Sequence, residues 1–130
     1  FLKNKIFIID ESYNSNPYSL KNSLLSFERK KLKRKIAILG DMAELGNFSN
    51  FYYWYLGKLI KNLKIDIIFT FGKESKKITE VSRKGIHFYE IDELKKKLKK
   101  EIRKQDAILI KGSRIMKMEE IVEFLKENFV

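Results

Sequence analysis

The sequence predicts one α/β domain of the three-layer, Rossmann-like kind, with helices on both faces of a mostly parallel sheet of about five or six strands. Three short segments are apolar at every position, at residues 6–9, 36–39 and 107–110. Strands of this kind belong to parallel sheets that are covered on both faces. Amphipathic helical patterns separate the strands, and strict alternation of strand and helix favours parallel strands joined by right-handed crossovers.

Ten elements are expected along the chain: strands at residues 5–10, 34–39, 66–71, 86–89 and 107–111, and helices at residues 18–29, 49–63, 75–82, 92–104 and 116–128. In the first helix, Leu20, Leu24 and Phe27 share one face. Pro17 suits a first helical turn, and Ser49 and Ser75 are suitable N-cap residues.

Length and composition fit one globular domain that spans residues 1–130. Hydrophobic residues make up 44% of the chain, and the lack of cysteine excludes disulfides and thiolate metal ligands. No segment approaches the roughly 20 apolar residues of a membrane-spanning helix. The chain starts at Phe1 and soon enters a core strand, so we expect it to be a domain of a longer polypeptide.

The net charge of +11 is carried mostly by two segments, residues 29–35 and 95–100. The second segment lies in an amphipathic helix whose apolar side carries Leu94, Leu98 and Ile102, so its lysines form the solvated side. No aromatic residue is interleaved with these lysines to stack on bases. We therefore expect ordinary solvated surface there, with no nucleic-acid partner and no membrane contact.

Three polar turns, at residues 10–17, 39–46 and 111–114, follow predicted strands. The carboxyl ends of parallel strands lie at one edge of a sheet, and open α/β sheets bind their ligands at that edge. We therefore expect the three turns to form a single site.

The first turn holds Asp10, Tyr13, Asn14 and Asn16. Asparagine tolerates left-handed backbone and can bond its own chain, so a turn that merely caps the next helix is the simplest interpretation. The turn is longer than a strand–helix connection needs, however, and Tyr13 adds a stacking surface. These two features favour a functional role.

The second turn holds Asp41 and Glu44 between Gly40 and Gly46. Carboxylates at the open edge of a sheet are suited to a magnesium ion or a ribose. An ordinary loop bounded by glycines explains the same residues equally well.

The third turn holds Lys111, Gly112, Ser113 and Arg114 directly before a helix. Two cations, a hydroxyl and backbone amides make an anion site there by charge and by helix dipole. The spacing is not that of a phosphate-binding P-loop. A lysine paired with a nearby acid is the structural alternative, but a lysine at the end of an apolar strand is costly, which favours function.

Two further features are interpreted as structural. His87, the single histidine, lies on a short strand far along the chain from the three turns. Tyr52, Tyr53, Trp54 and Tyr55 cluster at the second helix, where core packing or a domain contact is favoured over a cofactor site.

Taken together, the turns resemble the C-terminal domain of the MurF family of Mur ligases. The matching motifs are Asp-Glu-Ser-Tyr-Asn-Ser-Asn-Pro at 10–17, Leu-Gly-Asp-Met-Ala-Glu-Leu-Gly at 39–46, and Lys-Gly-Ser-Arg at 111–114 with Met-Glu-Glu at 118–120. Their order and spacing extend the resemblance over essentially the whole chain.

The resemblance implies a three-domain cytoplasmic enzyme that uses ATP and Mg²⁺ to join D-Ala-D-Ala to UDP-MurNAc-tripeptide through an acyl phosphate. ATP and Mg²⁺ are then held mainly by the central domain, and this domain, inactive alone, closes over the nucleotide against its own N-terminal and central domains. The implied roles are nucleotide contacts for Asp10, Tyr13, Asn14 and Asn16, substrate contacts for Asp41, Glu44, Tyr53, Ser113 and Arg114, a catalytic role for Lys111, and no metal ligand.

Two residues depart from the family pattern. Ser15 stands where alanine is usual, and Tyr53 stands where a histidine is common. A tyrosine can donate a hydrogen bond, but it does not titrate near neutrality.

Two other classes of protein fit parts of the pattern. A phospho-acceptor receiver domain also places acids after its first strand and a lysine after its fifth. It expects its acceptor after the third strand, however, whereas Asp41 follows the second. A basic nucleic-acid-binding module fits the charge alone.

Overall fold

The computed structural model describes residues 5–43 and 45–129, which form a five-stranded sheet with the order β1-β5-β2-β3-β4. All neighbouring strands are parallel. The strands are β1 (Phe7–Glu11), β2 (Arg34–Gly40), β3 (Ile67–Phe71), β4 (Ile86–Phe88) and β5 (Asp106–Lys111). The predicted parallel α/β sheet is therefore confirmed.

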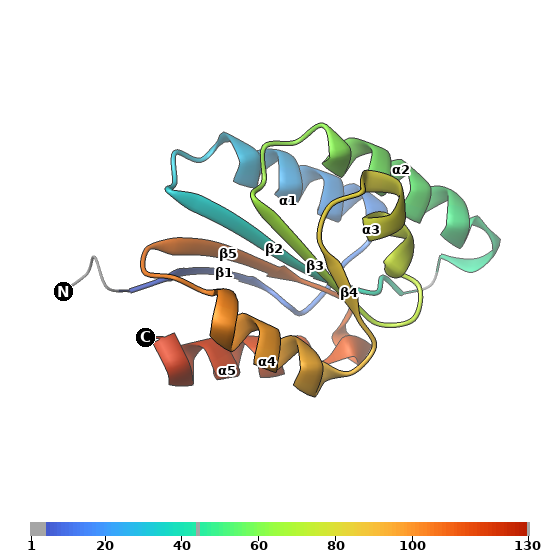
Figure 1. Ribbon diagram of the computed structural model, residues 1–130. Helices are drawn as coiled ribbons and strands as arrows, with labels where there is room; N and C mark the ends of the chain where they lie inside the picture. The colour runs from blue at the N-terminus through green and yellow to red at the C-terminus, as the bar shows by residue number, and fades with distance from the viewer. Residues whose placement is uncertain (1–4, 44, 130) are drawn as a thin grey trace.

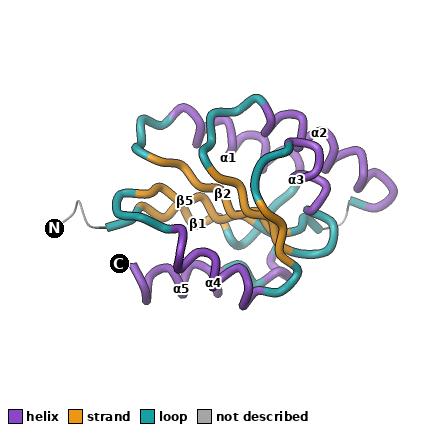
Figure 2. Tube along the Cα trace, in the orientation of Figure 1, coloured by secondary structure: helices purple, strands orange, loops and turns teal. Residues whose placement is uncertain are grey.

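Helices cover both faces of the sheet (Figures 1 and 2). α1 (Pro17–Arg29), α2 (Ser49–Lys61) and α3 (Lys76–Ser82) lie on one side, and α4 (Ile91–Glu101) and α5 (Glu119–Phe129) lie on the other. Two short 3₁₀ turns, η2 (Gly46–Phe48) and η3 (Arg114–Met116), lie next to α2 and α5. The three layers are those that the sequence predicts.

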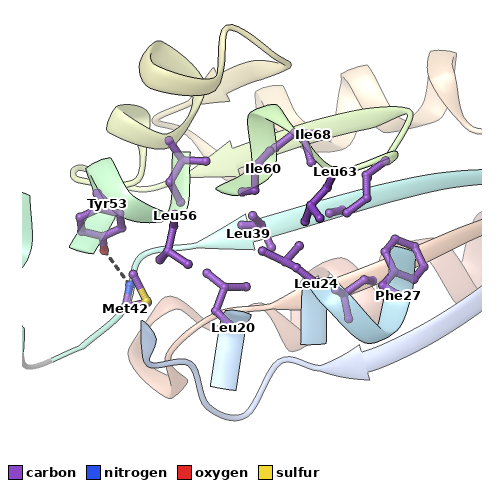
Figure 3. Packing of buried hydrophobic residues seen from close by; sticks show 14 of the residues in the cluster. Leu20, Leu24, Phe27, Leu39, Met42, Tyr53, Leu56, Ile60, Leu63 and Ile68 are labelled. Atoms are coloured by element: carbon purple, nitrogen blue, oxygen red, sulfur yellow. Dashed lines mark hydrogen bonds between the residues drawn. The ribbon is translucent and has the colours of Figure 1, made fainter. Parts of the chain in front are cut away.

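The side chains of the central strands alternate between two cores, because successive residues of a strand point to opposite faces. In β2, Ala37 and Leu39 join the core under α1 and α2, while Ile36 and Ile38 join the core under α4 and α5. Figure 3 shows the first of these cores, with Leu24 of α1 and further leucines and isoleucines packed together. Both cores exclude water, which explains why the strand is apolar throughout.

The N-caps of the first three helices differ in part from the sequence predictions. α1 begins at Pro17, and its N-cap is Asn16, whose side chain and backbone exchange hydrogen bonds with Ser19 in a capping box. Ser49 and Ser75, predicted as N-caps, make no cap hydrogen bond. Their hydroxyls donate instead to the Glu74 carboxylate and to the backbone carbonyl of Phe71.

The last helix begins at Glu119 and not at residue 116. Lys117 adopts a left-handed backbone with φ 53°, which ends η3 and interrupts the helical run. Met118 still packs fully buried in the core, so the apolar pattern places the side chain correctly although the helix starts later.

Candidate functional site

The three turns lie side by side at one rim of the sheet. β5 lies between β1 and β2, and the register places Lys111 opposite Glu11 on one side and opposite Leu39 on the other. The carboxyl ends of these three strands therefore gather at the same edge, as the parallel arrangement predicts. This rim is the candidate functional site.

Hydrogen bonds join the third turn to the other two. The Lys111 ammonium donates to the backbone carbonyl of Asn14 in the first turn, at 3.1 Å. The backbone N–H of Ser113 donates to the carbonyl of Asp41 in the second turn, also at 3.1 Å. A Cβ at Gly112 would lie 2.6 Å from the Met118 side chain and 3.4 Å from Cα of Gly40, so glycine leaves room for the core beneath and for the second turn beside it.

Lys111 is paired beneath the rim. Its side chain is 4% exposed, and its Nζ lies 3.1 Å from Oε1 of Glu11, which also accepts a hydrogen bond from the hydroxyl of Ser23. The pairing of the lysine with a nearby acid, raised as the structural alternative, is therefore present. The ammonium reaches the first turn through Asn14, so this chain places Lys111 as a support for that turn.

In the first turn, two side chains bond their own backbone and two face outward. The Asp10 carboxylate accepts from the N–H and the hydroxyl of Ser12, at 3.0 and 2.6 Å. The carboxamide of Asn16 is occupied by the cap of α1. Tyr13, which is 65% exposed, and Asn14 are therefore the residues of this turn best placed to touch a ligand.

The carboxylate of Asp41 binds the loop that precedes α3. It accepts from the backbone N–H groups of Lys73 and Ser75, both at 2.8 Å, and from that of Glu74 at 3.1 Å. Gly72 lies against the same carboxylate with φ +128°, a conformation that favours glycine. Asp41 thus fastens β2 to the β3–α3 loop, and Glu44, its predicted companion, lies outside the described residues.

Tyr53 lies in the core beneath the second turn and is 1% exposed. Its hydroxyl accepts the backbone N–H of Met42 at 2.8 Å (Figure 3). Burial raises the pKa of the Tyr53 hydroxyl, and the charges of Asp41 and Glu74 raise it further. The resemblance implied a substrate contact for Tyr53. Because the side chain is buried, any effect of Tyr53 on a substrate would act by positioning the backbone of Met42.

The third turn exposes Arg114 and buries Ser113. The hydroxyls of Ser113 and Ser15 are buried and have no hydrogen-bond partner among the described residues. Buried polar atoms without partners are uncommon in native proteins and often mark functional positions. Ser15, where the family usually has alanine, therefore adds a second such hydroxyl near the rim.

His87 binds the backbone carbonyl of Gly72, next to the loop that Asp41 anchors. Its Nε2 donates to the carbonyl of Gly72 and its Nδ1 accepts from the hydroxyl of Thr70, both at 2.7 Å, because a carbonyl can only accept. Burial lowers the pKa of the imidazole below its ordinary value. The structural role predicted for His87 agrees with these contacts, although it lies closer to the second turn than the sequence suggests.

An aromatic pocket adjoins the rim, and sequence reasoning did not predict it. It opens between the N-terminus of α1, the second turn and the start of α2, with a volume of about 690 Å³. Its lining consists of Asn16, Pro17, Tyr18, Lys21, Ala43, Leu45, Phe48, Phe51, Tyr52 and Tyr55. The run of aromatic residues at 51–55 was the sequence signal that could have indicated this pocket.

Residues 5–43 and 45–129 contain neither a cluster of metal ligands nor a membrane-spanning helix. No three His, Cys, Asp or Glu side chains there gather closely enough to hold a metal ion. No helix in the same ranges has the length and apolar character needed to cross a membrane.

An open parallel α/β sheet with its polar turns at the carboxyl rim defines a ligand-binding domain of the three-layer class. A family model described as "Mur ligase, glutamate ligase domain" matches residues 2–114. The chain belongs to this Mur ligase C-terminal domain family.

Curated relatives agree with this family. The chain is 40% identical over 96% of its length to the UDP-N-acetylmuramoyl-tripeptide–D-alanyl-D-alanine ligase of Buchnera aphidicola from Acyrthosiphon pisum. It is 37% identical over 93% of its length to the ligase of the same name from Bacillus subtilis. The chain spans 28% of the length of each of these relatives.

Solved structures show the same fold. The chain superposes on a MurF ligase from Thermotoga maritima in complex with ADP, with a TM-score of 0.82 and 27% identity. That match covers 98% of this chain and 29% of the solved one. A ligase from Acinetobacter baumannii matches with a TM-score of 0.82 and 26% identity over 94% of this chain and 27% of the solved one.

Proposed function

We propose that this chain is the C-terminal domain of an ATP-dependent ligase that adds D-Ala-D-Ala to UDP-MurNAc-tripeptide. The observation that carries the proposal is the assembly of the three motifs into one rim, in a chain that is 40% identical to a ligase of that name. The N-terminal and central domains of the same polypeptide are its proposed partners, and the cytoplasm, where ATP is available, is its proposed location.

The reaction requires two transfers. The γ-phosphoryl group of ATP passes to the tripeptide carboxylate, which gives an acyl phosphate and ADP. The amine of D-Ala-D-Ala then attacks the acyl carbon, the C–N bond forms, the C–O bond to phosphate breaks, and phosphate leaves while the amine loses a proton. This domain is proposed to contribute chiefly by positioning the reactants and excluding water.

The first turn suits the nucleotide. The exposed ring of Tyr13 offers a stacking face, and the carboxamide of Asn14 offers both a donor and an acceptor. The similar MurF ligase from Thermotoga maritima was solved in complex with ADP, which supports nucleotide use by the proposed enzyme. Asp10 and Asn16 would act by holding the turn in shape.

Magnesium is better suited to the central domain than to this rim. The carboxylates of Asp10, Glu11 and Asp41 are already engaged by Ser12, Lys111 and the β3–α3 loop. A hard cation needs free oxygen ligands. The phosphoryl groups of the reactants would instead meet Arg114, which is exposed, and the hydroxyl of Ser113.

The test is ligation by the full-length enzyme that carries this chain. With UDP-MurNAc-tripeptide, ATP and D-Ala-D-Ala, we expect release of ADP and phosphate in step with formation of the pentapeptide product. The 130-residue chain alone should give no turnover and bind ATP weakly, because one rim supplies only part of the site. Turnover by the isolated chain, or a full-length enzyme that ignores D-Ala-D-Ala, would refute the proposal.

A further inference from the structure

We infer that the aromatic pocket between α1 and α2 is the subsite for the carboxylate end of the incoming dipeptide. The inference rests on the proposed function, and it concerns a group of residues that lies outside the three sequence motifs except at Asn16, Pro17, Ala43 and Leu45. The pocket has about 690 Å³, which is in the range of small-molecule sites.

The charge of the pocket selects an anion. Lys21 is half-buried in the pocket wall, where its ammonium lies over the Tyr55 ring at 5.7 Å. Among the described residues no carboxylate forms a salt bridge with it, and the described lining residues include no acid. A cation that has no acidic partner within residues 5–43 and 45–129, beside an apolar pocket, favours a ligand that carries a carboxylate.

A second positive contribution comes from α1. Its N-terminus opens into the pocket at Asn16 and Pro17, and its first turn carries no acidic side chain. The Asn16 side chain already caps one N–H group there, but no carboxylate in the first turn offsets the remaining partial positive charge of this 13-residue helix. Lys21, one turn further along, adds a full charge on the same helix.

The walls suit small apolar side chains. Phe48 and Phe51 are more than half exposed, and Tyr52 and Tyr55 complete the aromatic side. The methyl groups of D-Ala-D-Ala are small and apolar, so contact with these rings removes apolar surface from water. Rings exposed to this extent on a folded domain mark a surface that another molecule covers.

The position of the pocket fits the chemistry of the acceptor. Asn16 and Pro17 belong to the first turn and Ala43 and Leu45 to the second, so the pocket borders the rim directly. A dipeptide with its carboxylate at Lys21 can extend its amine toward the first turn, where the nucleotide is proposed to lie. The amine is the group that must reach the acyl phosphate.

The test compares Lys21→Gln with Lys58→Gln in the full-length ligase. Lys58 is a matched control, because its ammonium also lies over an aromatic ring, that of Trp54 at 5.8 Å, but outside the pocket. Lys21→Gln is expected to raise KM for D-Ala-D-Ala by about tenfold, the loss of one charge-assisted hydrogen bond, with KM for ATP unchanged. Lys58→Gln should leave both values unchanged.

A second arm uses the ligand itself. The C-terminal amide of D-Ala-D-Ala lacks the carboxylate, so wild-type enzyme should use it about tenfold less well, and Lys21→Gln should show little further loss. Unchanged KM for the dipeptide in Lys21→Gln overturns the inference while ligation by the wild type upholds the proposed function. An equal rise in KM for ATP would place the nucleotide in the pocket and also overturn it.

Discussion

Lys111 is a charged residue held inside the molecule by its partners. It ends an apolar strand, is 4% exposed, and is neutralised by Glu11 while it fixes the carbonyl of Asn14. A buried lysine that lost these partners would carry a desolvation cost of several kcal/mol, on the order of that for other buried ions. Its charge is therefore used within the rim to fix the shape of the first turn.

We expect Lys111→Met to lower the free energy of unfolding by about 2 to 4 kcal/mol, because Glu11 and the Asn14 carbonyl lose their donor. Chemical denaturation of the 130-residue chain measures this change. Adding Glu11→Gln should cost less than the sum of the two single changes, since the pair acts as a unit. In the full-length enzyme, Lys111→Ala should lower the ligation rate by more than the loss of folded enzyme explains. Wild-type stability in Lys111→Met would contradict the role assigned here.

His87 makes the stability of the domain depend on pH. Its folded-state pKa lies below the ordinary value of 6.5, so the unfolded chain takes up a proton before the folded one does. Its contribution is fully present above pH 6.5 and is lost as the pH falls through that value toward the folded-state pKa. The nearby charges of Asp41 and Glu80 oppose the shift, and that of Lys76 adds to it.

The prediction is a lower Tm at about pH 5.5 than at about pH 7.5, measured by thermal unfolding in the two buffers. His87→Gln removes the titrating group, so the difference between the two Tm values should shrink. An identical pH dependence in this variant would show that other groups cause the effect.

Among the elements, the β3–α3 loop depends on a residue far away in the sequence. The Asp41 carboxylate at the end of β2 accepts from successive backbone amides at Lys73, Glu74 and Ser75. Ser75 was predicted to cap α3 with its own side chain, but the distant carboxylate supplies the acceptor that the loop amides need. The loop and the second turn therefore keep their shapes together.

Asp41→Ala is expected to lower the free energy of unfolding by about 1 to 3 kcal/mol, because three backbone amides, that of Ser75 part-buried, lose a charged acceptor. Amide hydrogen exchange should accelerate at Lys73, Glu74 and Ser75 before it does elsewhere. Glu123→Ala, at an exposed position of α5, serves as the control and should change neither quantity. Unaltered exchange in the loop would contradict the anchoring role.

How far the sequence predicts an element depends on whether its contacts are local. The strands and the helix faces follow from periodicity, which is why residues such as Leu24 and Ile38 lie in the expected cores. The start of α5 was wrong because one residue, Lys117, adopts a left-handed backbone. The sequence did not predict that the Asp41 carboxylate binds the β3–α3 loop. This role depends on backbone amides that follow the next strand and are distant in the sequence.

For the whole molecule, the net charge of +11 opposes compactness. Most lysines of residues 29–35 and 95–100 are exposed, as predicted, and α4 buries Leu94 and Leu98. Lys35 is the exception, because it is buried and its ammonium donates to the backbone carbonyl of Glu28. The family assignment leaves no role for the nucleic-acid or receiver classes. The motifs identify the family from sequence alone. The aromatic pocket could be recognised only in the folded structure, because its walls come from separate elements.

Salt should stabilise the isolated chain. Between about 10 and about 150 mM NaCl the Debye length falls from about 30 Å to about 8 Å, so repulsion among the lysines is screened. We expect Tm to rise over this range, and to rise less in a Lys30→Gln, Lys31→Gln variant, which removes two exposed cations. A Tm that falls with salt would show that attractive pairs, such as that of Lys111 with Glu11, dominate instead.

The bonds that tie the third turn to both others also limit how this rim can change over generations. A replacement that shifts the backbone at Ser113 or Asn14 also affects Asp41 or Lys111, because each pair shares a hydrogen bond to that backbone. Residues on different turns should therefore vary in concert among descendants, even where none of them meets a ligand. Change in the proposed dipeptide specificity is therefore expected more readily at the exposed aromatic residues of α2 than in these three bonded turns.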